Sequence, residues 1–268
     1  MPTRLIALWR ALRVALHIAY GLTLAIAYPR LAPALRQRIL QRWSSGLLGI
    51  LDVRIEHEGL AAPHDGLIVC NHISWLDIFV LNAVVPMRFV AKADVRRWPA
   101  IGWLCARAGT LFIQRGNARA AARMNTLLCD LLRQQQCLAV FPEGTTTDGA
   151  QVAHFHASLL QPAIDAGVAL HPFALRYEDT DGLRSLAAAY HADISFGRSL
   201  WTLLNTPHVY VRVHVGAAIA SQGQERRILA QQAYTRIAAV VTGAESHKLH
   251  PALTGTQHTE TNLHASTT

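Results

Sequence analysis

Short apolar runs alternate with helical periods between residues 51 and 243. Strands are predicted where an apolar or alternating run is bounded by turn residues, at 53–56, 67–70, 88–91, 110–113, 137–141, 169–175 and 209–215. Helices are predicted between them at 74–83, 95–106, 158–165 and 224–242, and the clearest one carries Met124, Leu127, Leu128, Leu131 and Leu132 on one face. Strands that alternate with helices predict an α/β fold, in which helices cover a mostly parallel sheet.

The first 50 residues follow a different pattern. Residues 14–29 are apolar except for His17 and Thr23. A helix of that length spans about 24 Å, short of the ~30 Å hydrocarbon core, so we expect it to lie in a membrane interface or to enter it halfway. A second helix is predicted where apolar residues recur every four positions beside arginines, at Leu35, Ile39, Trp43 and Leu47. Residues 1–50 are therefore expected to form a membrane-associated helical pair.

Charge supports this interpretation. The formal net charge is +8, and residues 1–50 contain no Asp or Glu but include Arg4, Arg10, Arg13, Arg30, Arg36, Arg38 and Arg42. These arginines lie among Leu, Ala and Ile, whereas arms that bind nucleic acid combine their cations with polar or aromatic residues. We expect a membrane lipid surface as a partner and no nucleic acid.

Two alternatives remain for the N-terminal run, namely a cleaved signal peptide and a helix of a soluble core. A signal peptide would lead to an oxidising compartment, where cysteines pair. Cys70, Cys105, Cys129 and Cys137 instead fall in apolar segments without the spacing of a disulfide scaffold. We therefore expect reduced cysteines, and a domain over 51–243 on the cytosolic face of the inner membrane. Residues 244–268 are polar, lack periodicity and are expected to be disordered.

Three polar loops follow predicted strands. They are Asn71-His72 with Asp77 beyond it, the end of segment 109–116 with Arg115, and the end of segment 141–147 with Glu143, Gly144 and Thr145. Because ligands bind at the carboxyl ends of parallel strands, these loops are candidates for one site. Each loop has a simpler interpretation as well. Ser74 and Asp77 match a capping box. Arg115 could be a surface cation, Glu143 a turn carboxylate, and the threonines after Gly144 a helix cap.

Taken together, these loops point to a known family. Asn71-His72-x4-Asp77, Gly109-x2-Phe112-Ile113-x-Arg115, Phe141-Pro142-Glu143-Gly144-Thr145 and His171-Pro172-Phe173-Ala174-Leu175 resemble the four motif blocks of the glycerolipid acyltransferases, above all the bacterial PlsC family of 1-acylglycerol-3-phosphate acyltransferases. The resemblance covers roughly residues 30–215. It implies transfer of a fatty acyl group from acyl-CoA or acyl carrier protein to a lysophospholipid hydroxyl. By the same resemblance His72 and Asp77 are the catalytic dyad, and Arg115, Glu143, Gly144, Thr145 and Asn71 bind the acceptor.

The residue types suit this chemistry. A base must take the proton of an alcohol as it attacks a thioester, which a histidine oriented by a carboxylate can do. The thiolate leaves readily because thiols have a pKa near ~8.5. There is no Gly-x-Ser-x-Gly motif, so no serine is expected to carry the acyl group. Cys70 lies in an apolar strand and is not expected to carry it either. No cofactor is expected, and no metal, because His154-x-His156 is too sparse.

Two positions depart from the family pattern. Many phosphatidate-forming members have Arg after Glu-Gly-Thr, where this chain has Thr146, so lyso-ornithine lipid is an alternative acceptor. Phe173 replaces a small residue of the more usual Val-Pro-Val sequence. An acyl thioesterase and a non-catalytic membrane-binding protein also remain open.

Overall fold

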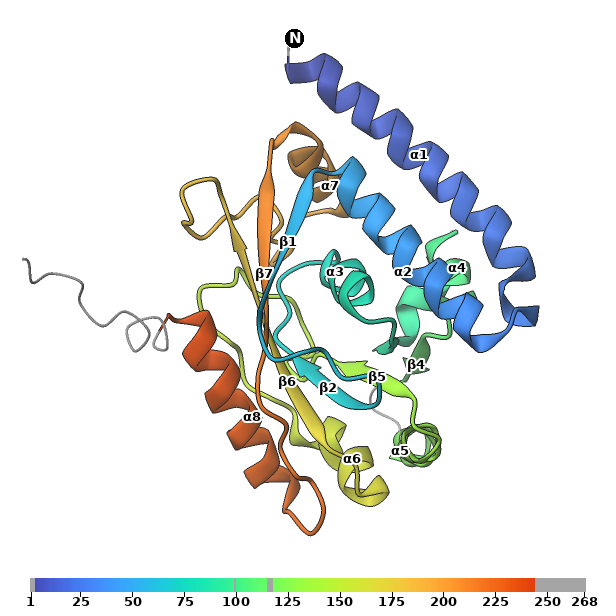
Figure 1. Cartoon of the computed structure of the whole chain (residues 1–268), viewed down its shortest axis with the longest axis vertical. Coiled ribbons are helices and arrows are strands. Elements are labelled where there is room, and N and C mark those ends of the chain that lie inside the picture. The colour runs from blue at the N-terminus through green and yellow to red at the C-terminus, as the bar shows by residue number, and fades with distance from the viewer. Residues whose placement is uncertain (1–2, 99, 115–117, 244–268) are drawn as a thin grey trace, which may run out of the picture.

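A seven-stranded sheet with helices on both faces forms the body of the computed structural model, which describes residues 3–98, 100–114 and 118–243 (Figure 1). Its strands are β1 (Val53–Gly59), β2 (Gly66–Cys70), β3 (Arg88–Lys92), β4 (Leu111–Ile113), β5 (Cys137–Val140), β6 (Leu170–Glu178) and β7 (Val209–Val215). They lie in the order β1-β7-β6-β2-β5-β3-β4. Among the strand pairs of the described residues, only β6–β7 is antiparallel, so β1 and β7 run opposite to the other five strands. The predicted mostly parallel α/β sheet is confirmed.

Two hydrophobic cores lie on the two faces of the sheet. The helices are α1 (Thr3–Ala27), α2 (Pro33–Ile50), α3 (Asp77–Val84), α4 (Ile101–Arg107), α5 (Ala118–Arg133), α6 (Gln161–Ala166), α7 (Phe196–Asn205) and α8 (Arg226–Val241). One core packs side chains of α2, α3 and α7 on the sheet, and the other packs those of α5, α6 and α8. The central strand β2 contributes side chains to both cores, with Ile68 and Cys70 on one face and Leu67 and Val69 on the other. Because both of its faces are buried, the sequence of β2 is a continuous apolar run.

Several element boundaries differ from the predictions. The helix expected at 95–106 is divided into a 3₁₀ turn, Ala93–Arg97, and α4, and Trp98 between them is extended with φ −68° and ψ 126°. Trp98 precedes a proline in the sequence, and residues before proline favour extended backbone. Strand β6 continues to Glu178 instead of ending at 175, and α7 was not predicted.

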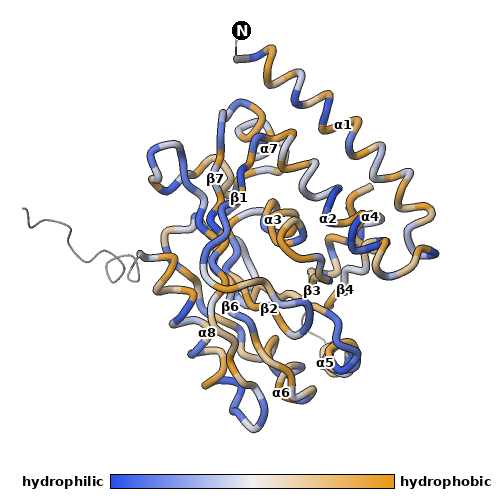
Figure 2. Tube along the Cα trace, viewed as in Figure 1, coloured by the Kyte–Doolittle hydropathy of each residue, from blue (hydrophilic) through white to orange (hydrophobic). Residues whose placement is uncertain are grey.

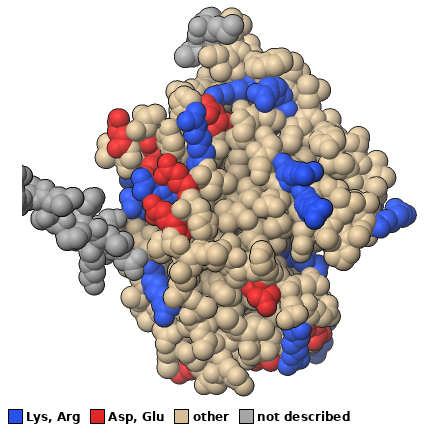
Figure 3. All heavy atoms as spheres, viewed as in Figure 1, with Lys and Arg blue, Asp and Glu red and all other residues tan. Residues whose placement is uncertain are grey.

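Helix α1 is longer than the 16-residue run suggested. It has 25 residues, and at ~1.5 Å per residue it measures roughly 37 Å, so the expected length of 24 Å was wrong. Residues 4–30 are long and apolar enough to cross a membrane, and only 11% of that segment is buried. Apolar positions recur along α1 in Figure 2. In Figure 3 the side of the molecule that carries α1 and α2 is mostly uncharged, with isolated basic patches.

Reciprocal contacts join α1 to α2. The His17 and Trp43 rings stack with their centroids 4.9 Å apart. His17 Nε2 lies 2.8 Å from the Trp43 carbonyl oxygen, and Trp43 Nε1 donates to the His17 carbonyl at 3.2 Å. Helix α2 in turn contributes Leu47 and Leu48, each 2% exposed, to the core that α3 shares. The helical pair is therefore continuous with the body of the protein.

A partly buried arginine, Arg10, fixes the N-terminal half of α1. Arg10 donates to the Thr206 carbonyl at 2.9 Å, just beyond the end of α7, and to Asp52 Oδ2 at 2.9 Å in the turn between α2 and β1. Its side chain is only 12% exposed. Arg10 therefore ties α1 to the domain, and it does not serve as one of the surface cations.

Candidate functional site

Two of the three predicted polar loops meet at one edge of the sheet. His72 lies two residues beyond the end of β2, and Glu143 lies three residues beyond the end of β5. These strands are parallel neighbours, with Val69 opposite Val140 near their ends. The loops that follow therefore leave the sheet side by side, as expected for parallel strands.

The His72–Asp77 pair forms the centre of this edge. Asp77 is the first residue of α3 and is fully buried. Its Oδ2 lies 2.8 Å from His72 Nδ1 and also accepts the backbone N–H groups of Ile73 at 2.7 Å and Ser74 at 2.9 Å. Its Oδ1 accepts the hydroxyl of Tyr177 at 2.7 Å. The carboxylate is thus fixed by four donors.

The turn between His72 and Asp77 combines two roles that the sequence suggested separately. The bond from the Ser74 N–H to Asp77 is the one a capping box predicts, while the same carboxylate oxygen holds the His72 ring. The Ser74 hydroxyl accepts the N–H of Leu76 at 3.2 Å, and α3 begins only at Asp77, not at residue 74. His72 lies outside the helix, which is how two residues five apart come into contact.

The geometry assigns the tautomer of His72. An ionised carboxylate only accepts hydrogen bonds, so the Nδ1 beside Asp77 carries the proton and the neutral ring keeps its lone pair on Nε2. Within the described part of the chain, Nε2 makes no hydrogen bond, and the side chain is 19% exposed. The ring also stacks on Phe141, with centroids 3.9 Å apart and planes within 9°. Such a histidine can accept a proton from a group outside the protein.

Glu143 connects the two loops from within. It is 4% exposed, and its Oε1 accepts the N–H of His72 at 2.6 Å while its Oε2 accepts the N–H of Ala153 at 2.7 Å. Burial raises the pKa of Glu143 to about 7, although both hydrogen bonds act against the rise. With both oxygens engaged by the backbone, this carboxylate positions His72.

The residues after Glu143 complete the connection. Gly144 has φ +69°, a left-handed conformation that side chains disfavour, so the turn needs glycine there. Thr145 is exposed, whereas the hydroxyl of Thr146 donates to the Tyr190 carbonyl. The N–H of Thr147 donates to the His72 carbonyl at 2.8 Å. Both backbone groups of His72 are therefore bound by the 143–147 loop.

The remaining predicted residues have different positions. Asn71 is 2% exposed and exchanges two hydrogen bonds with the backbone of Leu175, so its amide joins β2 to β6. Arg115 lies outside the described residues. Cys70 is fully buried, and burial together with the charges of Asp77 and Glu143 raises the pKa of its thiol well above the usual range. That thiol stays protonated and is a poor nucleophile.

Two side chains at the site were not identified from the sequence. Phe141 was predicted at the end of a strand and in the 141–147 motif but was given no role of its own, and Tyr177 lies beyond the predicted end of its strand. A signal for Tyr177 existed, because Phe173, Leu175 and Tyr177 alternate and therefore share one face of β6. Following that alternation for two more residues leads to a tyrosine at the carboxyl end of the strand beside β2.

Comparisons with known proteins identify relatives of this chain. The model of the acyltransferase family matches residues 52–176. The lyso-ornithine lipid O-acyltransferase of Pseudomonas aeruginosa is 37% identical over 247 residues, which are 90% of this chain and 95% of that protein. The 1-acyl-sn-glycerol-3-phosphate acyltransferase of Neisseria meningitidis is 36% identical over 212 residues, which are 78% of this chain and 83% of that protein.

The fold is also similar to a solved structure. The crystal structure of the 1-acyl-sn-glycerophosphate acyltransferase PlsC from Thermotoga maritima superimposes with a TM-score of 0.61 at 21% identity, covering 91% of this chain and 99% of that one. At this level of identity the likeness concerns the arrangement of helices and strands.

Proposed function

Since this chain belongs to the PlsC family of acyltransferases, we propose that it moves a fatty acyl group from acyl-CoA or acyl carrier protein to the sn-2 hydroxyl of 1-acylglycerol-3-phosphate, giving phosphatidic acid. The observation that carries the proposal is the His72–Asp77 pair, with Nδ1 bound to the buried carboxylate and Nε2 unbonded within the described residues. No cofactor takes part, because the thioester itself is the activated co-substrate.

In the proposed reaction His72 is a general base. Nε2 takes the proton of the acceptor hydroxyl while that oxygen attacks the thioester carbonyl carbon. Asp77 stabilises the imidazolium that forms. The tetrahedral intermediate then collapses, the C–S bond breaks, and the departing thiolate takes the proton back from Nε2. Two protein groups are enough because the thiolate is a good leaving group.

The acceptor is proposed to bind beside this pair. Glu143 and Gly144 shape the turn that faces it, and exposed Thr145 offers a hydroxyl to its polar end. Asn71 acts by joining the strands beneath the site. Arg115, from the neighbouring motif, is proposed to bind the acceptor phosphate, because a guanidinium can bind phosphate with two parallel hydrogen bonds.

Lyso-ornithine lipid is a second candidate acceptor. Thr146 supplies no positive charge, and its hydroxyl is already engaged by the Tyr190 carbonyl. A site with one cation fewer suits an acceptor without a terminal phosphate better. The similarity to the Pseudomonas aeruginosa protein over 95% of its length supports the same candidate.

The proposed location is the cytosolic face of the cytoplasmic membrane. Helix α1 has the length and apolar composition to enter a bilayer, and the acid-free N-terminal 50 residues favour an anionic lipid surface. The lysolipid substrate is held in that same surface, so association with the membrane brings enzyme and acceptor together.

A panel of acceptors tests the proposal. Purified protein in lipid vesicles receives a labelled acyl-CoA or acyl carrier protein, together with 1-acylglycerol-3-phosphate, lyso-ornithine lipid or no acceptor, and the products are identified by mass. Phosphatidic acid as the main product supports the first candidate, and acylated ornithine lipid supports the second.

Two outcomes would contradict acyl transfer altogether. Release of free fatty acid that is independent of any acceptor would identify a thioesterase. Absence of thioester cleavage with every acceptor and both donors, in folded and membrane-bound protein, would favour a non-catalytic membrane-binding protein.

A further inference from the structure

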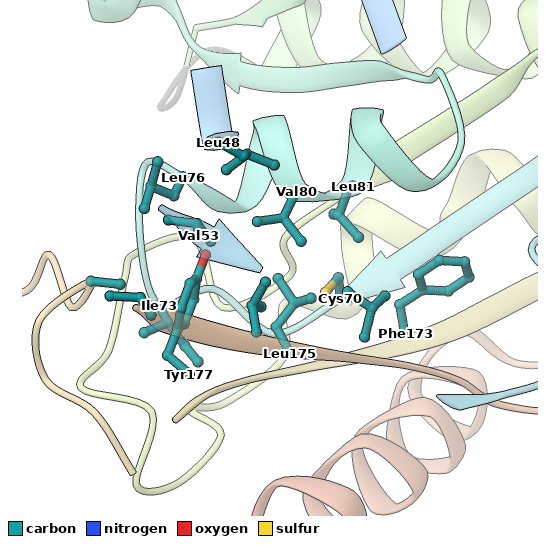
Figure 4. Packing of buried hydrophobic residues seen from close by; sticks show 14 of the residues in the cluster. Leu48, Val53, Cys70, Ile73, Leu76, Val80, Leu81, Phe173, Leu175 and Tyr177 are labelled. Carbon is teal, nitrogen blue, oxygen red and sulfur yellow. The ribbon is translucent and has the colours of Figure 1, made fainter. Parts of the chain in front are cut away.

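Tyr177 is a buried polar side chain that the proposed reaction does not use. It lies near the end of β6 with 2% of its surface exposed, and its ring packs in the core beneath α3. Figure 4 shows the ring among aliphatic side chains, with the hydroxyl at the end that points toward Leu76, the residue before α3. That hydroxyl donates to Asp77 Oδ1 at 2.7 Å.

The carboxylate that accepts this hydroxyl bond, Asp77, is the one that binds His72. Asp77 has no exposed surface, so Oδ1 has no access to bulk water, and within the described residues Tyr177 is its hydrogen-bond donor. The other oxygen, Oδ2, accepts from His72, Ile73 and Ser74. The final torsion of an aspartate side chain has a broad energy minimum, so the donors on its two oxygens determine its orientation. Tyr177 therefore fixes the plane in which Oδ2 faces the imidazole.

We propose that Tyr177 is a positioning residue, which acts on His72 through Asp77 in a linear Tyr177–Asp77–His72 hydrogen-bond chain. The proposal rests on the proposed function for its kinetic consequences. Tyr177 does not touch substrate in this arrangement. It orients the carboxylate and withdraws part of its charge, which sets how strongly the carboxylate holds the protonated imidazole.

The tyrosine is suited to act only as a donor. Burial and the adjacent Asp77 charge raise the pKa of its hydroxyl well above the usual range, so it keeps its proton. Other ionisable groups near this hydrogen-bond chain include Cys70 on β2, whose thiol also stays protonated, and Glu143 in the loop after β5. Asp148, Arg176 and Arg184 line the same surface pocket as Tyr177. Glu143 titrates close to neutral pH, so its charge contributes to the same pH profile.

The test is Tyr177→Phe, which removes the hydroxyl and keeps the ring. We expect kcat to fall roughly 10-fold, because the hydroxyl bond is made to a charged group, while KM stays within about 2-fold. The acid limb of the pH profile should move to higher pH, because a carboxylate with one donor fewer holds the protonated imidazole more tightly. Tyr28→Phe is the matched control, since its hydroxyl donates to the Arg36 carbonyl at 3.1 Å within the N-terminal helical pair.

A double-mutant cycle separates positioning from packing. If Tyr177 acts through Asp77, Tyr177→Phe should change the residual kcat of Asp77→Asn by less than about 2-fold. An equal loss in both backgrounds would overturn the proposal, as would a wild-type pH profile and kcat in Tyr177→Phe. Site-specific fluorotyrosine at position 177 retains the ring and is a stronger donor, so it should move the acid limb to lower pH even if the Phe variant folds poorly.

A spectroscopic measurement keeps this proposal distinct from the proposed function. The His72 Nδ1 proton should give a downfield NMR resonance that is absent in His72→Ala. Tyr177→Phe should shift this resonance and Tyr28→Phe should not. A protein without acyl transfer but with this shift would refute the proposed function alone, whereas an unmoved resonance would refute the role of Tyr177.

Discussion

At the scale of single residues, the site is defined by how many contacts fix His72. Asp77 binds its ring nitrogen, Phe141 packs on its ring face, and Glu143 and Thr147 bind its backbone N–H and carbonyl. In the proposed reaction, a base held in this way needs little reorganisation before it accepts a proton, which lowers the barrier to reaction.

Replacement of His72 tests its role as the base. His72→Ala should lower turnover of the acyl thioester with lysolipid by roughly 10²–10⁴-fold, because general-base catalysis is lost. The exposed His64→Ala is the control and should retain wild-type turnover. Circular dichroism and thermal melting establish that both variants are folded. Near-normal turnover in His72→Ala would exclude the general-base role.

Glu143 should make stability depend on pH. Its pKa rises from 4.5 to about 7 in the folded protein, so the folded state binds this proton more tightly than the unfolded chain. The contribution of Glu143 to the free energy of unfolding is therefore full below about pH 4.5 and is lost as the pH rises through about 7. The stability difference between wild type and Glu143→Gln should decrease over that interval and level off above it.

Denaturant unfolding at a series of pH values measures this difference. The exposed Glu225→Gln serves as the control and should give a difference from wild type that does not vary between about pH 5 and pH 8. A stability difference for Glu143→Gln that is independent of pH, or that increases with pH, would show that Glu143 does not titrate as described.

At the scale of helices and strands, the period of the sequence located most elements. Strand β7 has its predicted bounds, and β2 and β5 differ from theirs by one residue, because buried and alternating strands have strong patterns. Helix α7 was not predicted, although its buried Ser199, Leu203 and Leu204 recur at helical spacing. The meeting of His72 and Asp77 could be predicted, whereas the bond from Tyr177 depends on sheet order, which a single sequence does not contain.

The exposed face of α1 should mediate membrane binding. Leu8, Leu12 and Leu16 lie four residues apart and are 57%, 50% and 61% exposed. Their combined replacement by Gln should weaken binding to anionic vesicles roughly 100-fold or more, because each buried leucine contributes about 1.5–3 kcal/mol. Sedimentation with vesicles measures the effect.

Two leucines elsewhere provide the control for α1. Leu183 and Leu186 are 65% and 55% exposed in the segment between β6 and α7, and their replacement by Gln should leave vesicle binding unchanged. Equal losses in the two sets of variants would indicate non-specific adsorption, and unchanged binding in the α1 variant would place the membrane contact on another surface.

At the scale of the whole molecule, charge and sheet topology act together. The five strands that run in one direction bring the loops after β2 and β5 to one edge, and the N-terminal helical pair packs on the face that carries α3. The net charge of +8, with no acid in the first 50 residues, gives the protein a long-range attraction to anionic surfaces.

Membrane binding should therefore respond to salt. Raising the salt concentration from about 0.1 M to about 1 M shortens the screening length from about 10 Å to about 3 Å and should weaken binding to anionic vesicles. Binding to zwitterionic vesicles should be nearly independent of salt over the same range. Equal salt sensitivity for both lipid compositions would mean that the basic residues do not contact the lipid.

The close packing of α1 against α2 has a mechanical consequence. A Cβ atom added at Gly21 would lie 2.6 Å from Trp43 Nε1, and one added at Gly46 would lie 2.9 Å from His17 Cε1, so the two helices cannot slide past each other. Because Arg10 also ties α1 to the domain, α1 and His72, the proposed base, keep a fixed position relative to each other. On the proposed membrane, the depth to which α1 sinks therefore sets the height of His72 above the headgroups, and so which hydroxyl of a lipid it can reach.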